Sequence, residues 1–510
     1  MLFNSFIFLV FFAIVSTTYF VLPQKYRWVL LLVSSYIFYM AWEPTLIILI
    51  ILSTASNYIL AQLIYHRKSQ RKKKKLLIIS LIINFGLLFI FKYSMLINET
   101  FMAIYHEIAT VFFTASGNEP ERATLLADNL LIRYPLEKYS IILPMGISFY
   151  TFQAVAYTVD VYRGVIKPVS EYGIFSLYIT FFPQLVAGPI ERSKNLMPQF
   201  FKEHHFDKER VLYGLKIMVY GFFKKIVIAD RLAIVVDTVY NNPREYSGMY
   251  LIVATLCFTV QLYCDFSGYS DIAIGSAKVL GFELRENFRN PYFSKSIREF
   301  WKRWHISLSS WFTDYVYIPL GGNRCSENRH FFNLLATFLL SGLWHGANWT
   351  FLLWGGLHGI YLIIEILSAR FRYDLRRTLY LEKTLMGKVV GTVVTMIFVS
   401  YAWILFRANT VSDGIYIMTH LFDGFSRFMT KQYLYEVITS LGVSLYELQL
   451  LFIAVAFLFL SEFCCGKKQV YAQIERLFYG GRLIFYVAIS TLILIGGSFY
   501  AGGQFIYFQF

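Results

Sequence analysis

Long runs of apolar residues, interrupted by short polar or basic segments, recur along the whole chain. A helix of roughly 20 apolar residues is long enough to cross a bilayer. We therefore expect roughly ten to thirteen membrane segments, some of them shorter than a full crossing. The clearest candidates are residues 6–22, 28–42, 45–65, 76–93, 139–162, 174–190, 249–266, 349–364, 389–406, 449–463 and 483–501.

The composition agrees with this pattern. Hydrophobic residues make up 57% and charged residues 15% of the 510 residues, and the mean hydropathy is +0.51. These values lie far outside the range of soluble domains and predict an all-α integral membrane protein. The first apolar run has no basic segment before it and no small-residue cleavage site after it, so we expect it to be retained. The five cysteines form no CxxC pair, and we expect neither a disulfide framework nor a metal site.

The basic residues predict the topology. The net charge is +15, but in a membrane protein lysine and arginine mark the cytoplasmic loops, so nucleic acid is not an expected partner. The segment HRKSQRKKKK at 66–75 is the strongest mark and places the N-terminus outside, with the mixed-charge stretch 98–137 also outside. The last apolar run should leave the cytoplasm, because four basic residues precede it: Lys467, Lys468, Arg476 and Arg482.

The C-terminal tail, QFIYFQF, is unusually aromatic. Chain ends are commonly poorly ordered and exposed to water, where aromatic side chains gain no free energy from burial. The tail is expected to form an aromatic belt at the outer membrane surface or to dock inside the protein. Its aromatic residues are Phe505, Tyr507, Phe508 and Phe510.

A tryptophan-rich stretch follows in the second half of the chain. Residues 300–318 have the three-to-four spacing of an amphipathic helix at a membrane interface. His305 lies at the edge of its apolar stripe, and Lys302, Arg303 and Asp314 lie off it. The stripe consists of Trp301, Trp304, Leu308, Trp311 and Tyr315.

The next apolar arm, residues 331–344, is only about two thirds of a full crossing and ends at the polar sequence HGAN. If the chain turns at Gly346, His345 lies within the bilayer's thickness, in a pocket or tunnel. Such a histidine is either functional or a hydrogen-bonding contact between helices. Random order would give roughly 0.2 Trp-His dipeptides, and the chain has two, Trp304-His305 and Trp344-His345.

Five motifs together resemble the membrane-bound O-acyltransferase (MBOAT) family, in its alginate and peptidoglycan O-acetyltransferase branch. The resemblance implies a polytopic MBOAT-type helical bundle around a central funnel or tunnel. It also implies that His345 is catalytic and that His305 is its usual companion. The motifs are LPMGISFYTFQ (143–153), FFPQLVAGPIER (181–192), YCDFSGYSDIAIG (263–275), REFWKRWHISLSSWFTDYVYIPLGGNR (298–324) and SGLWHGANWTFLLWGGLHG (341–359).

The chemistry of acyl transfer fits these residues. A hydroxyl that attacks a thioester must lose its proton, and an imidazole in a low-dielectric pocket stays neutral and able to accept it near pH 7. We expect His345 to be this base, and His305, Trp304 or Asn348 to hold the thioester carbonyl as charge develops. Acetyl-CoA is the expected donor substrate, and no bound cofactor is expected. The candidates for lining the donor tunnel are Trp304, Arg303, Trp344, Asn348, Asp265 and Asp271, and internal ion pairing is the alternative role for the two aspartates.

The tail is similar to the Phe-x-Tyr-x-x-Phe end of the small single-span partner in the teichoic acid D-alanylation system. This similarity implies that residues 481–510 are an additional transmembrane helix with an extracytoplasmic tail, attached to an acyltransferase core of residues 1–480. Tyr507 would carry the acyl group, because a phenol with a pKa near 10 is a better leaving group than a sugar hydroxyl. Phe505, Phe508 and Phe510 would dock the tail.

The expected function is the transfer of an acetyl group from cytosolic acetyl-CoA, through Tyr507, to an extracytoplasmic polysaccharide. The resemblance implies a bacterial inner membrane and an extracytoplasmic SGNH/GDSL-like acetyltransferase as partner, beside membrane lipid. Alginate, peptidoglycan and other exopolysaccharides remain open as acceptors. A polytopic transporter or flippase for an envelope precursor is the alternative, since broken helices also mark transport sites. A scaffold without catalysis is a third possibility.

Overall fold

The computed structural model describes residues 1–117, 119–130, 144–186, 188–381, 384–466, 469–497 and 505. Within these ranges the regular elements are helices, and no strand is present. The N-terminal part consists of α1 (Phe6–Val21), α2 (Gln24–Met40), η1 (Pro44–Leu46), α3 (Ile47–His66), α4 (Gln70–Leu88), η2 (Phe89–Tyr93), α5 (Ser94–Ala115) and α6 (Pro120–Leu130).

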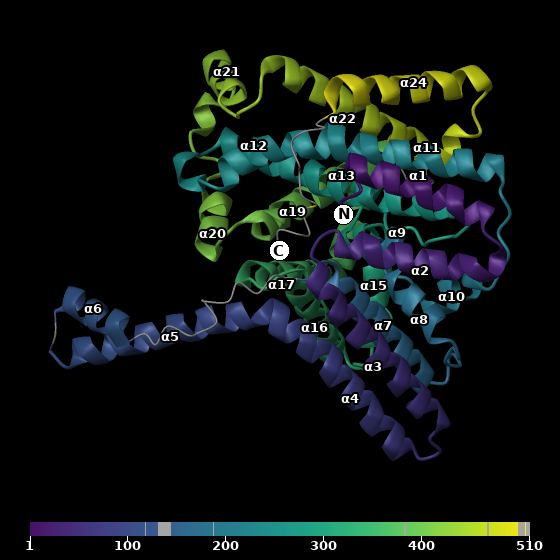
Figure 1. Ribbon diagram of the computed structural model, residues 1–510. Coiled ribbons are helices and arrows are strands. Elements are labelled where there is room, and N and C mark those ends of the chain that lie inside the picture. Colours follow the sequence, from purple (N-terminus) through teal and green to yellow (C-terminus); the bar gives the residue numbers. More distant parts are fainter. Residues whose placement is uncertain are drawn as a thin grey trace.

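The remaining helices form the body of the molecule (Figure 1). The middle part consists of α7 (Ile147–Tyr162), α8 (Tyr172–Thr180), α9 (Phe182–Leu185), α10 (Ser193–Phe200), α11 (Lys208–Phe222), η4 (Phe223–Ala229), α12 (Asp230–Tyr240), η5 (Pro243–Glu245), α13 (Met249–Leu280), η6 (Pro291–Phe293), α14 (Ile297–Trp301), α15 (Ile306–Phe312), η7 (Thr313–Tyr317), α16 (Glu327–His345) and α17 (Trp349–Leu367). The C-terminal part consists of α18 (Ala369–Thr378), α19 (Leu385–Arg407), α20 (Val411–His420), η8 (Phe425–Arg427), α21 (Lys431–Thr439), α22 (Leu445–Cys465), α23 (Val470–Ile474) and α24 (Tyr479–Gly496).

Seven of the described helices are long and apolar enough to cross a membrane. One of them is the continuous 46-residue helix Gln70–Ala115, made of α4, the π-helical segment η2 and α5. Helix α1 is apolar but has only 16 residues. The prediction of an all-helical, multi-pass membrane protein is confirmed. The seven are Pro44–His66, Gln70–Ala115, Met249–Leu280, Trp349–Leu367, Leu385–Arg407, Leu445–Cys465 and Tyr479–Gly496.

Helix α13 forms the core of the bundle. In its apolar window 61% of the residues are buried, against 17% in α24 at the edge of the molecule. It packs directly on α11, because a Cβ on Gly221 would lie 2.7 Å from the carbonyl oxygen of Gly268. Glycine pairs of this kind let helix backbones touch, which is how membrane helices associate without a hydrophobic driving force. This contact fixes the element that carries the motif of 263–275.

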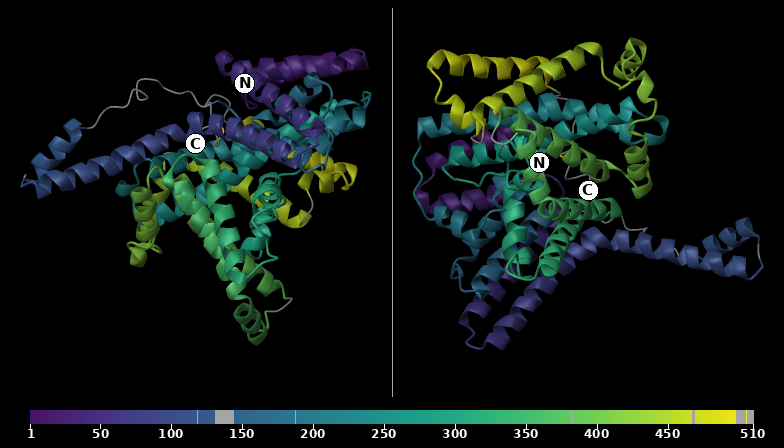
Figure 2. Two further views of the ribbon diagram at one scale, coloured as in Figure 1. Left: turned by 90° about the horizontal axis from the view of Figure 1, so that it is seen from below. Right: turned by 180° about the vertical axis from the view of Figure 1, so that it is seen from behind.

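A helical arm projects from one side of the body. Figure 1 shows α5 and α6 extending away from the bundle, and the two views of Figure 2 show the same projection. The arm contains most of the mixed-charge stretch that the sequence places outside. Its other end leads back through η2 and α4 to the bundle, where η2 contacts the last residues of α16.

Two of the elements predicted from the sequence are wrong. Residues 174–190 do not form one membrane segment, because the chain bends at Phe181 and continues as the separate short helix α9. Pro183 lies in the first turn of α9, where a missing N–H is tolerated, whereas within one continuous helix it would remove a backbone hydrogen bond and clash with the preceding turn. Residues 300–318 do not form one amphipathic helix either. They contain the end of α14, a break, α15 and the π-helical segment η7.

Candidate active site

His345 is the last residue of α16 and lies inside the protein. The turn expected at this point is confirmed, because α16 ends at His345 and α17 begins three residues after Gly346. Only 3% of His345 is exposed. The side chain of Asn348 accepts a hydrogen bond from the amide of Thr350 at 2.9 Å and so caps the start of α17. The α16–α17 hairpin therefore places a histidine at the buried end of the 19-residue helix α16.

His305 lies in the break between α14 and α15. Its φ of 42° is in the left-handed region, which non-glycine residues rarely occupy. Such a conformation costs about 1–3 kcal/mol and persists where the surrounding packing requires it, often at functional sites. His305 is completely buried. The break turns it inward, whereas a continuous helix would leave it at the edge of the apolar stripe.

The two histidines face each other inside the bundle. Their ring centroids are 6.4 Å apart, although 40 positions separate them in the sequence. Around them lies an aromatic shell. Trp354 and Phe406 contact the His345 ring edge-on, with centroids at 5.0 and 5.3 Å. Phe266 contacts the His305 ring with centroids 4.6 Å apart, and Trp344 lies beside both histidines, at 5.9 Å from His305 and 4.9 Å from His345.

Lys92 and Tyr93, which the sequence analysis did not select, close the end of α16. The ammonium of Lys92 donates hydrogen bonds to the carbonyl oxygens of Trp344 and His345, each at 2.8 Å. The Tyr93 hydroxyl donates to the carbonyl oxygen of Leu343 at 2.5 Å. The last carbonyls of a helix lack partners within the helix, and a cation there also complements the helix dipole. Lys92 is thus a positioning residue for His345.

A third histidine, His358, lies on α17 behind the pair. Its Nδ1 accepts a hydrogen bond from the indole of Trp301 at 3.3 Å. Trp354 stands between the two histidines of the hairpin, with its ring centroid 5.0 Å from His345 and 5.1 Å from His358. In the described part of the chain, no group of three His, Cys, Asp or Glu side chains is placed to hold a metal ion.

The remaining tunnel candidates lie at different distances from this centre. Trp304 is buried among other aromatic rings, including Phe288 at 5.0 Å and Trp403 at 5.1 Å. The guanidinium of Arg303 donates to Glu299 Oε1 at 2.5 Å and to the carbonyl oxygen of Asn290 at 3.2 Å. Trp304 therefore supports the aromatic shell, while Arg303, in the break after α14, pairs with the carboxylate of Glu299 in α14.

The two aspartates of α13 form buried ion pairs. Lys224 approaches Asp271 at 2.5 Å, and Lys225 pairs with both Asp265 and Asp230. Both lysines belong to the π-helical segment η4, which widens the helix so that successive lysines point to α13 and α12. Paired charges avoid the full cost of burial in a membrane interior. The geometry gives Asp265 and Asp271 partners that hold η4 against α13.

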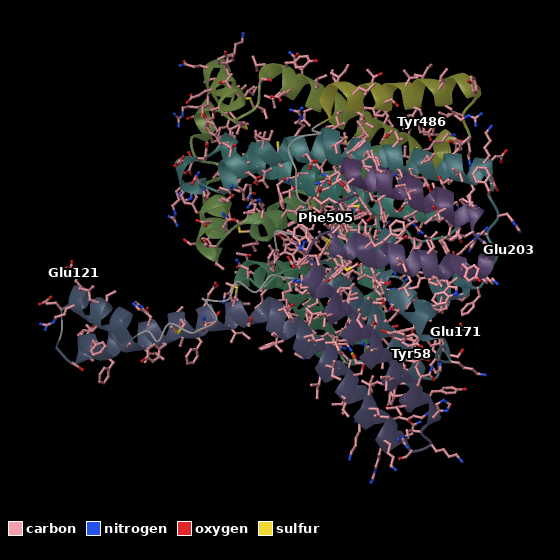
Figure 3. All side chains as sticks on the ribbon, viewed as in Figure 1. Tyr58, Glu121, Glu171, Glu203, Tyr486 and Phe505 are labelled. Atoms are coloured by element: carbon pink, nitrogen blue, oxygen red, sulfur yellow. The ribbon has the colours of Figure 1, made fainter. Side chains whose placement is uncertain are left out.

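Phe505 is the one aromatic residue of the tail that the structure describes. It is fully buried near the centre of the bundle (Figure 3) and stacks on Tyr269 with centroids 4.5 Å apart. It also contacts Phe266 at 5.7 Å, and Phe266 in turn contacts the His305 ring. Tyr507, Phe508 and Phe510 lie outside the described residues.

A cavity of about 410 Å³ lies between α14–η7 and the α16–α17 hairpin. Its lining reaches Ser341, one helical turn before His345, and Trp301, which donates to His358. The same lining contains three basic side chains, those of Arg298, Lys302 and His330. This cavity thus has polar and basic side chains in its lining, and its walls come close to the buried histidines.

Comparison with known proteins identifies the family. The sequence profile of the MBOAT, membrane-bound O-acyltransferase, family matches residues 169–407. The chain is 35% identical over 476 residues to "Probable alginate O-acetylase AlgI" of Azotobacter vinelandii, covering 93% of this chain and 86% of that protein. It is 36% identical over 480 residues to the protein of the same description in Pseudomonas aeruginosa, covering 93% and 83%. It is also 35% identical over 316 residues to the "Peptidoglycan O-acetyltransferase" of Helicobacter pylori, covering 57% and 59%.

These matches decide between the enzyme and the transporter that the sequence analysis left open, in favour of the enzyme. The matched family segment contains both Trp-His dipeptides and the α16–α17 hairpin. The chain belongs to the membrane-bound O-acyltransferase family and is an O-acyltransferase.

Proposed function

We propose that this protein moves an acetyl group from cytosolic acetyl-CoA across the membrane, by way of an ester on Tyr507, for O-acetylation of an extracytoplasmic polysaccharide. The names of the relatives support the acyl group and the acceptor class, since they describe an alginate O-acetylase and a peptidoglycan O-acetyltransferase. The basic segment at 66–75 supports the orientation, because it marks the cytoplasmic side.

The donor enters through the cavity next to α14 and the α16–α17 hairpin. Arg298 and Lys302 in its lining suit the phosphates of coenzyme A. The pantetheine arm then extends along Ser341 toward His345, which lies one turn further along α16. Only the pantetheine arm of coenzyme A and the thioester need to enter the dry interior of the bundle.

His345 acts as the general base. It takes the proton of the Tyr507 hydroxyl while the phenol oxygen attacks the thioester carbonyl carbon. The C–O bond forms, the C–S bond breaks, and the coenzyme A thiolate leaves with the proton returned by His345. His305, whose ring lies 6.4 Å from that of His345, would interact with the developing oxyanion.

The observation that carries the proposal is the burial of Phe505. This residue stands two positions before Tyr507, and its ring packs on Phe266, which itself contacts His305. A tail held at this point brings the following residues within a short reach of the histidine pair, since two residues span at most about 7 Å. Phe508 and Phe510 are proposed to complete the docking.

The second half of the reaction occurs outside the cytoplasm. A hydroxyl of the partner enzyme attacks the acetyl-tyrosine ester, and the phenol leaves with the proton of that hydroxyl. We propose an SGNH/GDSL-like acetyltransferase as this partner and the bacterial inner membrane as the location.

Mass spectrometry of the C-terminal peptide tests the proposal. Purified protein is incubated with isotope-labelled acetyl-CoA, and we expect a labelled acetyl group on Tyr507 that is absent from the His345→Ala variant. Unlabelled Tyr507 in a wild-type protein that consumes the thioester would contradict the tyrosine carrier. Direct transfer to the partner would then replace it.

Replacement of Lys92 by methionine is expected to lower kcat for tail acetylation about 10- to 100-fold, because a shift of about 1 Å in a reacting group can cost this much. Methionine has a similar length but cannot donate to the carbonyls of Trp344 and His345. The KM for acetyl-CoA should stay within about twofold, since Lys92 is not part of the donor cavity lining.

Lys92→Arg should recover part of kcat, because it restores a cationic donor at the end of α16. Lys25→Met is the matched control, since it removes an exposed lysine at the start of α2. A normal kcat in Lys92→Met, or a loss that arises only from unfolding in a thermal melt, would argue against the positioning role.

A further inference from the structure

A second cavity system lies away from the histidines, where α17, α18 and α19 meet. One cavity of about 420 Å³ runs between α17 and α19, and a second of about 420 Å³ adjoins it beside α18. The two share Lys295, Arg372 and Arg376 in their linings, so they adjoin each other, and we treat them together as one space. We call its apolar part the apolar groove, lined by Tyr361, Ile364, Val390, Val394 and Phe398.

The outer part of this space is strongly basic. We call it the basic mouth, and it is lined by Lys295, Arg372, Arg376 and Lys388. In the described ranges no carboxylate forms an ion pair with any of the four. The one acidic residue in the lining, Glu365, accepts a hydrogen bond from the amide of Arg298 at 3.2 Å. Four clustered cations without a carboxylate partner favour an anion.

Close contacts bring the two arginines over the groove. Arg372 donates to the carbonyl oxygen of Glu365 at 2.6 Å, which ties α18 back to α17. A Cβ on Gly391 would lie 3.2 Å from Arg376 Nη2 and 3.2 Å from the Lys295 carbonyl oxygen. Arg376 and the segment before α14 therefore both lie against α19 at Gly391. One anion can contact groups from α18, α19 and this segment together.

Helix α18 has the character of a helix that lies in a membrane surface. Residues 368–388 contain six basic residues and two acidic ones, which marks the cytoplasmic side. Large apolar side chains of the same helix, Phe371 and Leu375, are 68% and 44% exposed. A short helix with exposed apolar and basic side chains is typical of the interface between headgroups and acyl chains.

We propose that this space binds one anionic phospholipid of the cytoplasmic leaflet, with its phosphate in the basic mouth and an acyl chain in the apolar groove. Basic pockets between membrane helices on the cytoplasmic side are suited to phospholipid headgroups. A free phosphate or the phosphates of coenzyme A would use the mouth but leave the groove without a role. The bound lipid joins α18 and α19 to the segment that leads into α14 and His305.

Native mass spectrometry of the purified full-length protein tests this proposal. Phosphatidylglycerol and phosphatidylcholine with identical acyl chains are added, and we expect one phosphatidylglycerol to be retained preferentially. The double variant Arg372→Gln/Arg376→Gln should weaken its binding roughly tenfold or more, since each basic residue near a membrane surface contributes about 1 kcal/mol. Arg370→Gln/Arg377→Gln is the matched control, because it removes the same charge from α18 outside both linings.

A second pair of variants tests the apolar groove. Val394→Trp should fill it and lower phosphatidylglycerol binding, whereas Val393→Trp changes an exposed neighbour outside the lining and should not. Thermal melts of all variants establish that they are folded. Equal retention of the two lipids, or equal losses in the test and control arginine pairs, would overturn the proposal. So would displacement of phosphatidylglycerol by inorganic phosphate or acetyl-CoA together with normal binding in Val394→Trp.

Discussion

Replacement of His345 by glutamine or alanine is expected to lower the rate of acetyl transfer to the tail by about 10²- to 10⁴-fold, the usual contribution of a general base. The side chain is 3% exposed and surrounded by Trp344, Trp354 and Phe406, so water cannot readily replace it as a proton acceptor. Coenzyme A release and labelling of the C-terminal peptide measure the rate. The glutamine variant keeps the size of the side chain and therefore preserves the aromatic shell.

His66→Ala is the matched control, because this exposed histidine ends α3 and is expected to leave the rate unchanged. Thermal melts show whether a lost rate reflects a lost fold. A His345→Gln protein that is folded and still transfers acetyl groups within about threefold of wild type would exclude His345 as the base. His305 would then be the residue to test next, since its ring lies 6.4 Å away.

The membrane helices were predicted correctly where the length of an apolar run alone determines the helix. The runs 45–65 and 389–406 correspond closely to α3 and α19. The run 249–266 was too short, because α13 continues to Leu280 through Asp265 and Asp271. These carboxylates end the apolar run in the sequence, yet in the structure they pair with Lys225 and Lys224. Pairing between distant segments is not visible in local hydropathy.

The position of the candidate site could be predicted only in part, again because contacts between distant segments are not visible in the sequence. The polar sequence HGAN indicates where His345 lies, because a polar interruption between two apolar segments at membrane depth occurs only where the chain is buried in protein or lines a cavity. Lys92 carried a usable signal, because a single lysine in an apolar run marks a functional contact by default. The break at His305 has no comparable signal in the sequence. The aromatic stripe of 300–318 satisfies helical periodicity, and only tertiary packing forces the left-handed backbone there.

Replacement of Tyr507 by phenylalanine is expected to abolish acetyl labelling of the tail and to reduce polysaccharide O-acetylation in cells by about 10²-fold or more, because the variant lacks the nucleophilic oxygen. The ring is kept, so docking of the tail through Phe505 on Tyr269 and Phe266 should be preserved. Phe505→Ala should instead slow labelling of an intact Tyr507. Burial of one such ring contributes about 1.5 to 3 kcal/mol, or roughly 10- to 100-fold.

Tyr479→Phe is the matched control, since this tyrosine at the start of α24 is 74% exposed and should behave as wild type. The two tail variants separate chemistry from docking. If Tyr507→Phe alone eliminates transfer while Phe505→Ala only slows it, the tyrosine carries the acyl group and the phenylalanine positions it. If both variants lower O-acetylation equally and slightly, the tail contributes packing to the bundle, and the acetyl group must pass from the thioester directly to an extracytoplasmic acceptor.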